Sequence, residues 1–151
     1  PFSRRLLVVI ESERRNFMTI ALLCILLAAI MPIVCAGLAK GRDMTVSHKD
    51  GGYDNLNPRD WIAKQQGFKK WAQSAQENCW EALPFFAAAV IVSHMLGVIG
   101  WLPNALAVAF VVLRVIYIAL YVTGKQQARS LVWAAAFLVN ATIFLLPLIR
   151  V

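Results

Sequence analysis

Residues 18–39, with the sequence MTIALLCILLAAIMPIVCAGLA, decide the class of the fold because no charged side chain interrupts them. As an α-helix, this stretch is long enough to cross roughly 30 Å of hydrocarbon. The composition agrees, since 60% of the residues are hydrophobic, only 15% are charged, and the mean hydropathy is +0.63. A soluble domain has about a quarter of its residues charged. The sequence therefore predicts an all-α integral membrane protein with a single domain.

A second uncharged run, residues 82–113, is too long for one straight helix and is interrupted by Gly100, Pro103 and Asn104. A β-barrel is not expected, because apolar runs this continuous do not alternate as barrel strands do. Within the loop after the first span, Asn57-Pro58 predicts the start of a short helix. The tryptophans near the expected span ends are interpreted as interfacial anchors. These are Trp71, Trp101 and Trp133. We expect a four-transmembrane-helix bundle, with helices over approximately residues 18–39, 68–101, 105–123 and 131–149.

Residues 1–17 precede this membrane domain, which we place at residues 18–151. We interpret them as an N-terminal extension, either native or an expression remnant. If they are native, the apolar residues 6–10 among flanking arginines predict an interfacial amphipathic helix.

The net charge of +7 comes mostly from basic residues beside the expected spans. They do not form a groove-binding stripe, so no nucleic-acid partner is expected. The third loop carries Lys125 and Arg129, and the second loop carries no basic residue. The first loop is the most basic, with Lys40, Arg42, Lys49, Arg59, Lys64, Lys69 and Lys70. The positive-inside rule places the first and third loops in the cytoplasm and both termini outside, although arginines within residues 1–17 oppose this orientation.

The three cysteines, Cys24, Cys35 and Cys79, lie in or at the edge of apolar spans. This placement indicates neither a disulfide framework nor a metal site. They are interpreted as small buried hydrophobic residues, with a reactive Cys79 as the minor alternative.

Polar residues gather on one stripe of the second expected helix. Lys70, Ser74, Asn78 and Glu81 follow one another at i, i+4, i+8 and i+11, so they share a helix face. Burying Glu81 in hydrocarbon would cost several kcal/mol, and such groups usually face a bundle interior or a ligand.

A matching stripe lies on the third expected helix, where Arg114, Tyr117 and Tyr121 follow at i, i+3 and i+7. Together the two stripes suit a zwitterionic, anionic ligand that enters from the cytoplasmic side. The alternative is purely structural. Glu81 and Arg114 would then form a buried pair that locks two helices, and the tyrosines would be packing aromatics.

At these residues the chain resembles the MAPEG family of membrane-associated proteins in eicosanoid and glutathione metabolism. The resemblance runs from about Met18 to the end. It is most specific over residues 75–84 (AQENCWEALP) and residues 114–121 (RVIYIALY), followed by Arg129-Ser130. The loop over residues 53–59 (YDNLNPR) looks like that of bacterial members. The resemblance implies a homotrimer in a bacterial inner membrane, with glutathione held between neighbouring subunits.

The resemblance also implies roles for individual residues. Asn78 and Glu81 look like the residues that hold the glutathione backbone, with Glu81 taking its amino group, and Gln76 matches a further peptide contact. Tyr117 and Tyr121 look like the tyrosines that line the pocket. Arg114 and Arg129 look like the arginines that neutralise carboxylates or stabilise the thiolate. The implied activity is that of a glutathione-dependent transferase or peroxidase acting on lipophilic electrophiles or hydroperoxides.

One position departs from the family pattern. Ser74 stands where well-studied members carry an arginine that anchors a glutathione carboxylate, and Lys70, one turn earlier, is the candidate substitute. This departure favours the alternative function, a non-catalytic lipid-binding protein or an accessory subunit of a larger membrane complex. A small transporter or channel is the weakest alternative, because the chain has too few charges to line an aqueous path.

Overall fold

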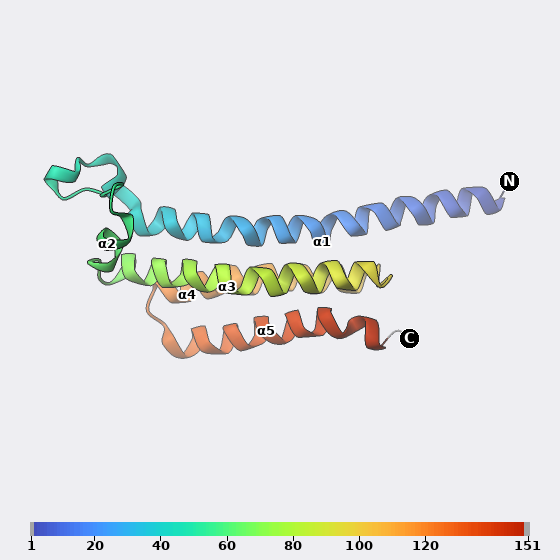
Figure 1. Ribbon diagram of the computed structural model, residues 1–151. Coiled ribbons are helices and arrows are strands. Elements are labelled where there is room, and N and C mark those ends of the chain that lie inside the picture. The colour runs from blue at the N-terminus through green and yellow to red at the C-terminus, as the bar shows by residue number, and fades with distance from the viewer. Residues whose placement is uncertain (1, 150–151) are drawn as a thin grey trace.

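Long helices run side by side in the computed structural model, which describes residues 2–149, with side chains from Ile20 onward (Figure 1). Helix α1 packs against α3 and α4, while α5 packs against α3 and α4. The long helices are α1 (Phe2–Lys40), α3 (Phe68–Met95), α4 (Trp101–Val122) and α5 (Gln126–Ile149). The expectation of an interfacial amphipathic helix over residues 1–17 rests on side chains outside the described residues.

Three segments are long and apolar enough to cross a membrane, namely Ile20–Thr45, Trp101–Val122 and Gln126–Ile149. These segments confirm the prediction of an all-helical membrane protein. Helix α3 is also long, but Lys69, Lys70, Glu77 and Glu81 lower its hydropathy. It lies within the same bundle, between α1 and α5 (Figure 1).

Helix α1 begins at Phe2, ahead of the expected residue 18, and three later helix boundaries also differ from the sequence prediction. Helix α3 ends at Met95 and α4 already begins at Trp101, because the chain turns at Gly97 and Gly100, whose φ values are +79° and +144°. Pro103 therefore falls in the first turn of α4, where its missing N–H costs no helical hydrogen bond. Helix α5 begins at Gln126, ahead of the expected residue 131, since the turn from α4 needs little more than Gly124.

The first loop and the turn between α4 and α5 lie at the same end of the bundle (Figure 1). The first loop contains η1 (Gly41–Thr45), η2 (His48–Asp50) and α2 (Pro58–Ala63). Pro58 opens α2 as expected, but the Asn57 side chain does not cap it. Instead, Asn57 donates to the Asp54 carboxylate, which also accepts from the backbone N–H groups of Leu56 and Asn57. The bond from the Asn57 side chain, together with these backbone bonds, lowers the pKa of Asp54.

The bundle core is apolar and built around two stacked rings. Phe86 of α3 and Phe110 of α4 stack with their ring centroids 4.0 Å apart, and both side chains are buried. Ala21, Cys24 and Ala28 of α1 belong to the same cluster. Small side chains such as these let the backbones of membrane helices approach closely. This packing sets the rotation of α3 and α4 about their axes and so decides which polar residues face each other.

Candidate functional site

Arg114 is the centre of the candidate site. Its side chain lies in the middle of α4 and is only 2% exposed. Its Nη2 donates to Asn78 Oδ1 at 3.0 Å and to Cys79 Sγ at 3.3 Å. The antiparallel packing of α3 and α4 thus joins the two polar stripes that the sequence placed on separate helices.

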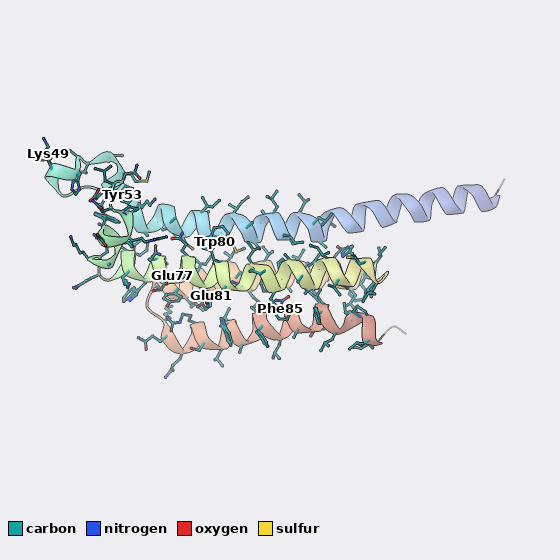
Figure 2. The ribbon with its side chains drawn as sticks, viewed as in Figure 1. Lys49, Tyr53, Glu77, Trp80, Glu81 and Phe85 are labelled. Atoms are coloured by element: carbon teal, nitrogen blue, oxygen red, sulfur yellow. The ribbon has the colours of Figure 1, made fainter. Side chains whose placement is uncertain are left out.

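Among the described side chains, Glu81 is connected to Arg114 through Asn78 alone. The Asn78 Nδ2 donates to Glu81 Oε2 at 3.3 Å, and Glu81 itself is exposed. Among the side chains described, the ion pairs within 4.0 Å are His48–Asp54 and Lys69–Asp43. The buried Glu81–Arg114 pair, which the sequence left open as a structural alternative, therefore does not form. Glu77, Glu81 and Phe85 instead lie along the face of α3 toward α5 (Figure 2).

Two cations flank a pair of phenol rings in a row that runs from α4 into α5. The Arg114 guanidinium carbon lies 4.4 Å from the centroid of the Tyr117 ring, and that of Arg129 lies 4.2 Å from the Tyr121 ring. The two phenol rings meet edge to face at 5.6 Å. Cation–π contacts of this kind hold guanidinium groups in place without neutralising them. The row therefore holds two positive charges, one in the middle of α4 and the other in the first turn of α5.

A cavity of about 190 Å³ opens beside Arg114. One part of its wall is polar, formed by Asn78, Glu81 and Arg114, and the remainder is apolar and largely aromatic. The aromatic lining consists of Phe85, Phe110, Trp133 and Phe137. Such a wall can hold a polar group at one end and a lipophilic group at the other.

Sequence reasoning missed the aromatic half of this cavity. Trp133, which the sequence predicts to be an interfacial anchor, also stacks on Phe137 with ring centroids 5.8 Å apart and lines the cavity. The signal that could have found the pair is their i, i+4 spacing, which places both on one face of α5.

Two predicted ligand contacts lie away from this cavity. Gln76 lines a separate cavity of about 170 Å³ formed by α1, α2, α3 and the first loop, together with Lys40, Arg59 and Trp61. Lys70 is exposed near the start of α3, and Ser74 is half-buried. The structure thus brings together Asn78, Glu81 and Arg114, with Tyr117, Tyr121 and Arg129 in an adjoining row. It leaves Gln76 and Lys70 outside the cavity wall.

Arg114 has no carboxylate partner among the described side chains. A buried cation without a counter-charge is costly unless an anion or a polar network compensates it. Both of its described hydrogen bonds use Nη2. The remaining N–H donors of the guanidinium suit an anionic group such as a thiolate or carboxylate.

These features define a class of protein, a membrane-embedded helical bundle with a buried cation at an amphipathic cavity. The model of the MAPEG family matches residues 20–149, and the chain belongs to the MAPEG family. This match confirms the resemblance noted in the sequence, and it associates the chain with glutathione-related or lipid-metabolising roles. Neither the curated proteins nor the solved structures contain a match.

Proposed function

We propose that the protein is a membrane-bound, glutathione-dependent transferase or peroxidase that acts on lipophilic electrophiles or hydroperoxides. The observation that carries this proposal is the buried Arg114 at the wall of an amphipathic cavity, with no carboxylate partner among the side chains that the structure describes. A free thiol has a pKa near 8.5, so little thiolate is present at neutral pH. A guanidinium beside the sulfur favours the thiolate, which is the nucleophile.

This proposal assigns a separate role to each residue of the site. Arg114 stabilises the glutathione thiolate, with Arg129 as the second candidate. Asn78 and Glu81 bind the peptide, and the exposed carboxylate of Glu81 is free to accept the ammonium group. The aromatic wall receives the lipophilic substrate from the membrane. The thiolate sulfur then attacks an electrophilic carbon and displaces its leaving group. With a hydroperoxide it attacks the terminal oxygen, the O–O bond breaks, and the alkoxide takes up a proton to give an alcohol. A second glutathione then converts the sulfenic acid to glutathione disulfide and water. The protein contributes proximity and electrostatic stabilisation.

The assembly and topology are part of the same proposal. We infer that α3 crosses the membrane as the fourth helix, because it lies in the bundle beside the apolar helices. The loop end of the bundle would face the cytoplasm of a bacterial inner membrane, as its basic residues favour. Gln76 lines a different cavity from Arg114 within one chain, so in a homotrimer with the ligand held between subunits Gln76 would have to contact it from a neighbouring subunit. Native mass spectrometry from detergent should give the mass of three chains.

The test is calorimetric titration of glutathione into the purified protein in nanodiscs. We expect saturable binding that Glu81→Gln weakens. Glu77→Gln is the matched control, because Glu77 is also exposed and lies one turn away on the same face of α3 (Figure 2). No binding at millimolar glutathione, or equal losses in both variants, would contradict the proposal.

A second candidate function is non-catalytic lipid binding, or a role as an accessory subunit of a membrane complex. Ser74 favours it, because the family arginine that anchors a glutathione carboxylate is missing. Thiol dependence separates the two functions. A lipid-binding protein would bind fatty acyl probes in the aromatic cavity and show no glutathione-dependent turnover with any electrophile.

A further inference from the structure

The second hydrogen bond of Arg114 ends on a thiol of the protein itself. Cys79 Sγ accepts it at 3.3 Å, and the Cys79 side chain is 4% exposed. Cys35 of α1, fully buried, packs with Cys79 in a cluster that also contains Met31 and Ala75. Two cysteines from different helices therefore meet beside a buried cation.

The positive charge of Arg114 favours the reactive, ionised form of the Cys79 thiol. The described hydrogen-bond partners of Arg114 are Asn78 and Cys79, and of these only Cys79 can ionise. A nearby guanidinium stabilises a thiolate, and the thiolate is the reactive form of cysteine. Cys24, by contrast, lies in the separate Phe86–Phe110 cluster and is buried among apolar side chains. The chain thus contains both a thiol beside a cation and a matched inert one.

There is room for one reacting atom at this sulfur. A cavity of about 10 Å³ is lined by both Cys79 and Arg114. That volume is close to the space one water molecule requires. The terminal oxygen of a hydroperoxide has the same size. The rest of this wall is apolar, formed by Ala28, Met31, Ala82, Leu83 and Phe110. Ala82, Phe110 and Arg114 also line the larger cavity of about 190 Å³, so the alkyl or acyl group of a hydroperoxide would lie there while its terminal oxygen reaches Cys79.

We propose that Cys79 and Cys35 form a redox-active dithiol that reduces lipophilic hydroperoxides without glutathione. The Cys79 thiolate attacks the terminal oxygen, the O–O bond breaks, and the leaving alkoxide takes up a proton to give an alcohol. Cys79 is thereby oxidised to a sulfenic acid. The Cys35 sulfur then displaces the hydroxyl group, which leaves as water, and a disulfide joins α1 to α3. Overall, two thiols supply two electrons, and the hydroperoxide becomes one alcohol and one water.

The experiment uses the full chain in nanodiscs, free of glutathione, with cumene hydroperoxide as the probe. Free thiols are counted by alkylation and mass spectrometry after unfolding. The protein starts with three free cysteines, and we expect one to remain, with the disulfide mapped to Cys35 and Cys79. Cys24→Ser should form the same disulfide. Cys35→Ser should stop at the sulfenic acid and give one dimedone adduct on Cys79.

Arg114→Gln tests the role of the cation and should slow oxidation at least about tenfold, with circular dichroism as the check on folding. Three alkylatable thiols after peroxide treatment, or a disulfide that includes Cys24, would overturn the proposal. A Cys35→Ser protein without a dimedone adduct would also overturn it. Because no glutathione is present, the result is independent of the proposed glutathione activity. A protein that binds no glutathione yet forms the disulfide would contradict the earlier proposal alone.

Discussion

Arg114 Nη2 donates to Asn78 Oδ1 at 3.0 Å, across residues that are 36 positions apart in the sequence. This hydrogen bond connects α4 to α3 inside the bundle and orients the guanidinium toward the cavity. Asn78 in turn donates to Glu81 Oε2, so one amide couples a buried cation to an exposed carboxylate. Asn78 therefore has a structural role and, in the proposed function, a binding role.

Asn78→Ala should weaken glutathione binding about tenfold, which corresponds to about 1.4 kcal/mol. The variant removes both the acceptor that orients Arg114 and the donor that orients Glu81. Calorimetry in nanodiscs measures the change. Asn78→Asp keeps the acceptor for Arg114 and should retain more of the affinity than the alanine variant. Wild-type affinity in Asn78→Ala would refute this role.

Arg114→Lys should lower turnover about 100-fold while changing glutathione affinity much less. A lysine keeps the charge but has no planar guanidinium, so it cannot donate to Asn78 and a thiolate at the same time with the same geometry. Turnover is measured with a lipophilic electrophile at saturating glutathione. Arg129→Lys serves as the comparison, and a larger loss there would move the role of thiolate stabiliser to Arg129. Equal losses of affinity and turnover in Arg114→Lys would contradict a role limited to the thiolate.

Ser74→Arg should tighten glutathione binding about tenfold, because it adds a guanidinium on the polar stripe one turn before Asn78. Ser74→Gln, which adds length without charge, is the control. Unchanged affinity in the arginine variant would mean that position 74 does not reach the ligand.

Lys70→Ala tests whether Lys70 substitutes for the missing arginine. Lys70 is exposed and lies outside the cavity wall, so contact requires its long side chain to extend along α3. We expect a loss of affinity smaller than that of Asn78→Ala, measured by the same titration. An affinity equal to that of the wild type would exclude the substitution.

The pKa of Asp54 should lie below its ordinary value of 3.8. Its pKa is lowered in the folded loop, so its contribution to stability is present above the unfolded pKa. That contribution is lost as the pH falls through the lowered pKa. The carbon-13 shift of the Asp54 carboxyl group, followed by NMR against pH, measures the midpoint. Asn57→Ala removes the largest cause of the shift and should raise the midpoint, whereas a midpoint that stays constant in this variant would be inconsistent with the Asn57 bond.

Phe86→Ala should destabilise the bundle by about 3 kcal/mol, because it opens a cavity against the stacked Phe110 ring. Thermal unfolding in detergent, followed by circular dichroism, compares it with Leu138→Ala. Leu138 is 65% exposed and should change the midpoint little. Similar losses in both variants would mean that the stacked pair is not the packing centre.

Much of the candidate site could be predicted because it depends on helical spacing. Asn78 and Glu81 share a face of α3, and Arg114 and Tyr117 share a face of α4, since residues three or four apart lie on one side of a helix. Gln76 was placed in the same pocket, yet it is two positions from Asn78. Two positions turn an α-helix by about 200°. Gln76 therefore points to another side of α3 and lines the separate cavity of about 170 Å³.

The sequence by itself determined that this is a helical membrane protein of the MAPEG family, because uncharged length and local motifs can be identified without knowing which helices touch. Only the tertiary structure decided that Asn78, rather than Glu81, bonds to Arg114. It also decided that Trp133 completes the cavity and that Cys35 meets Cys79. The physical reason is that these contacts depend on the rotation of each helix about its axis. That rotation is set by packing between distant segments, such as the Phe86–Phe110 stack, and leaves no local signal in the sequence.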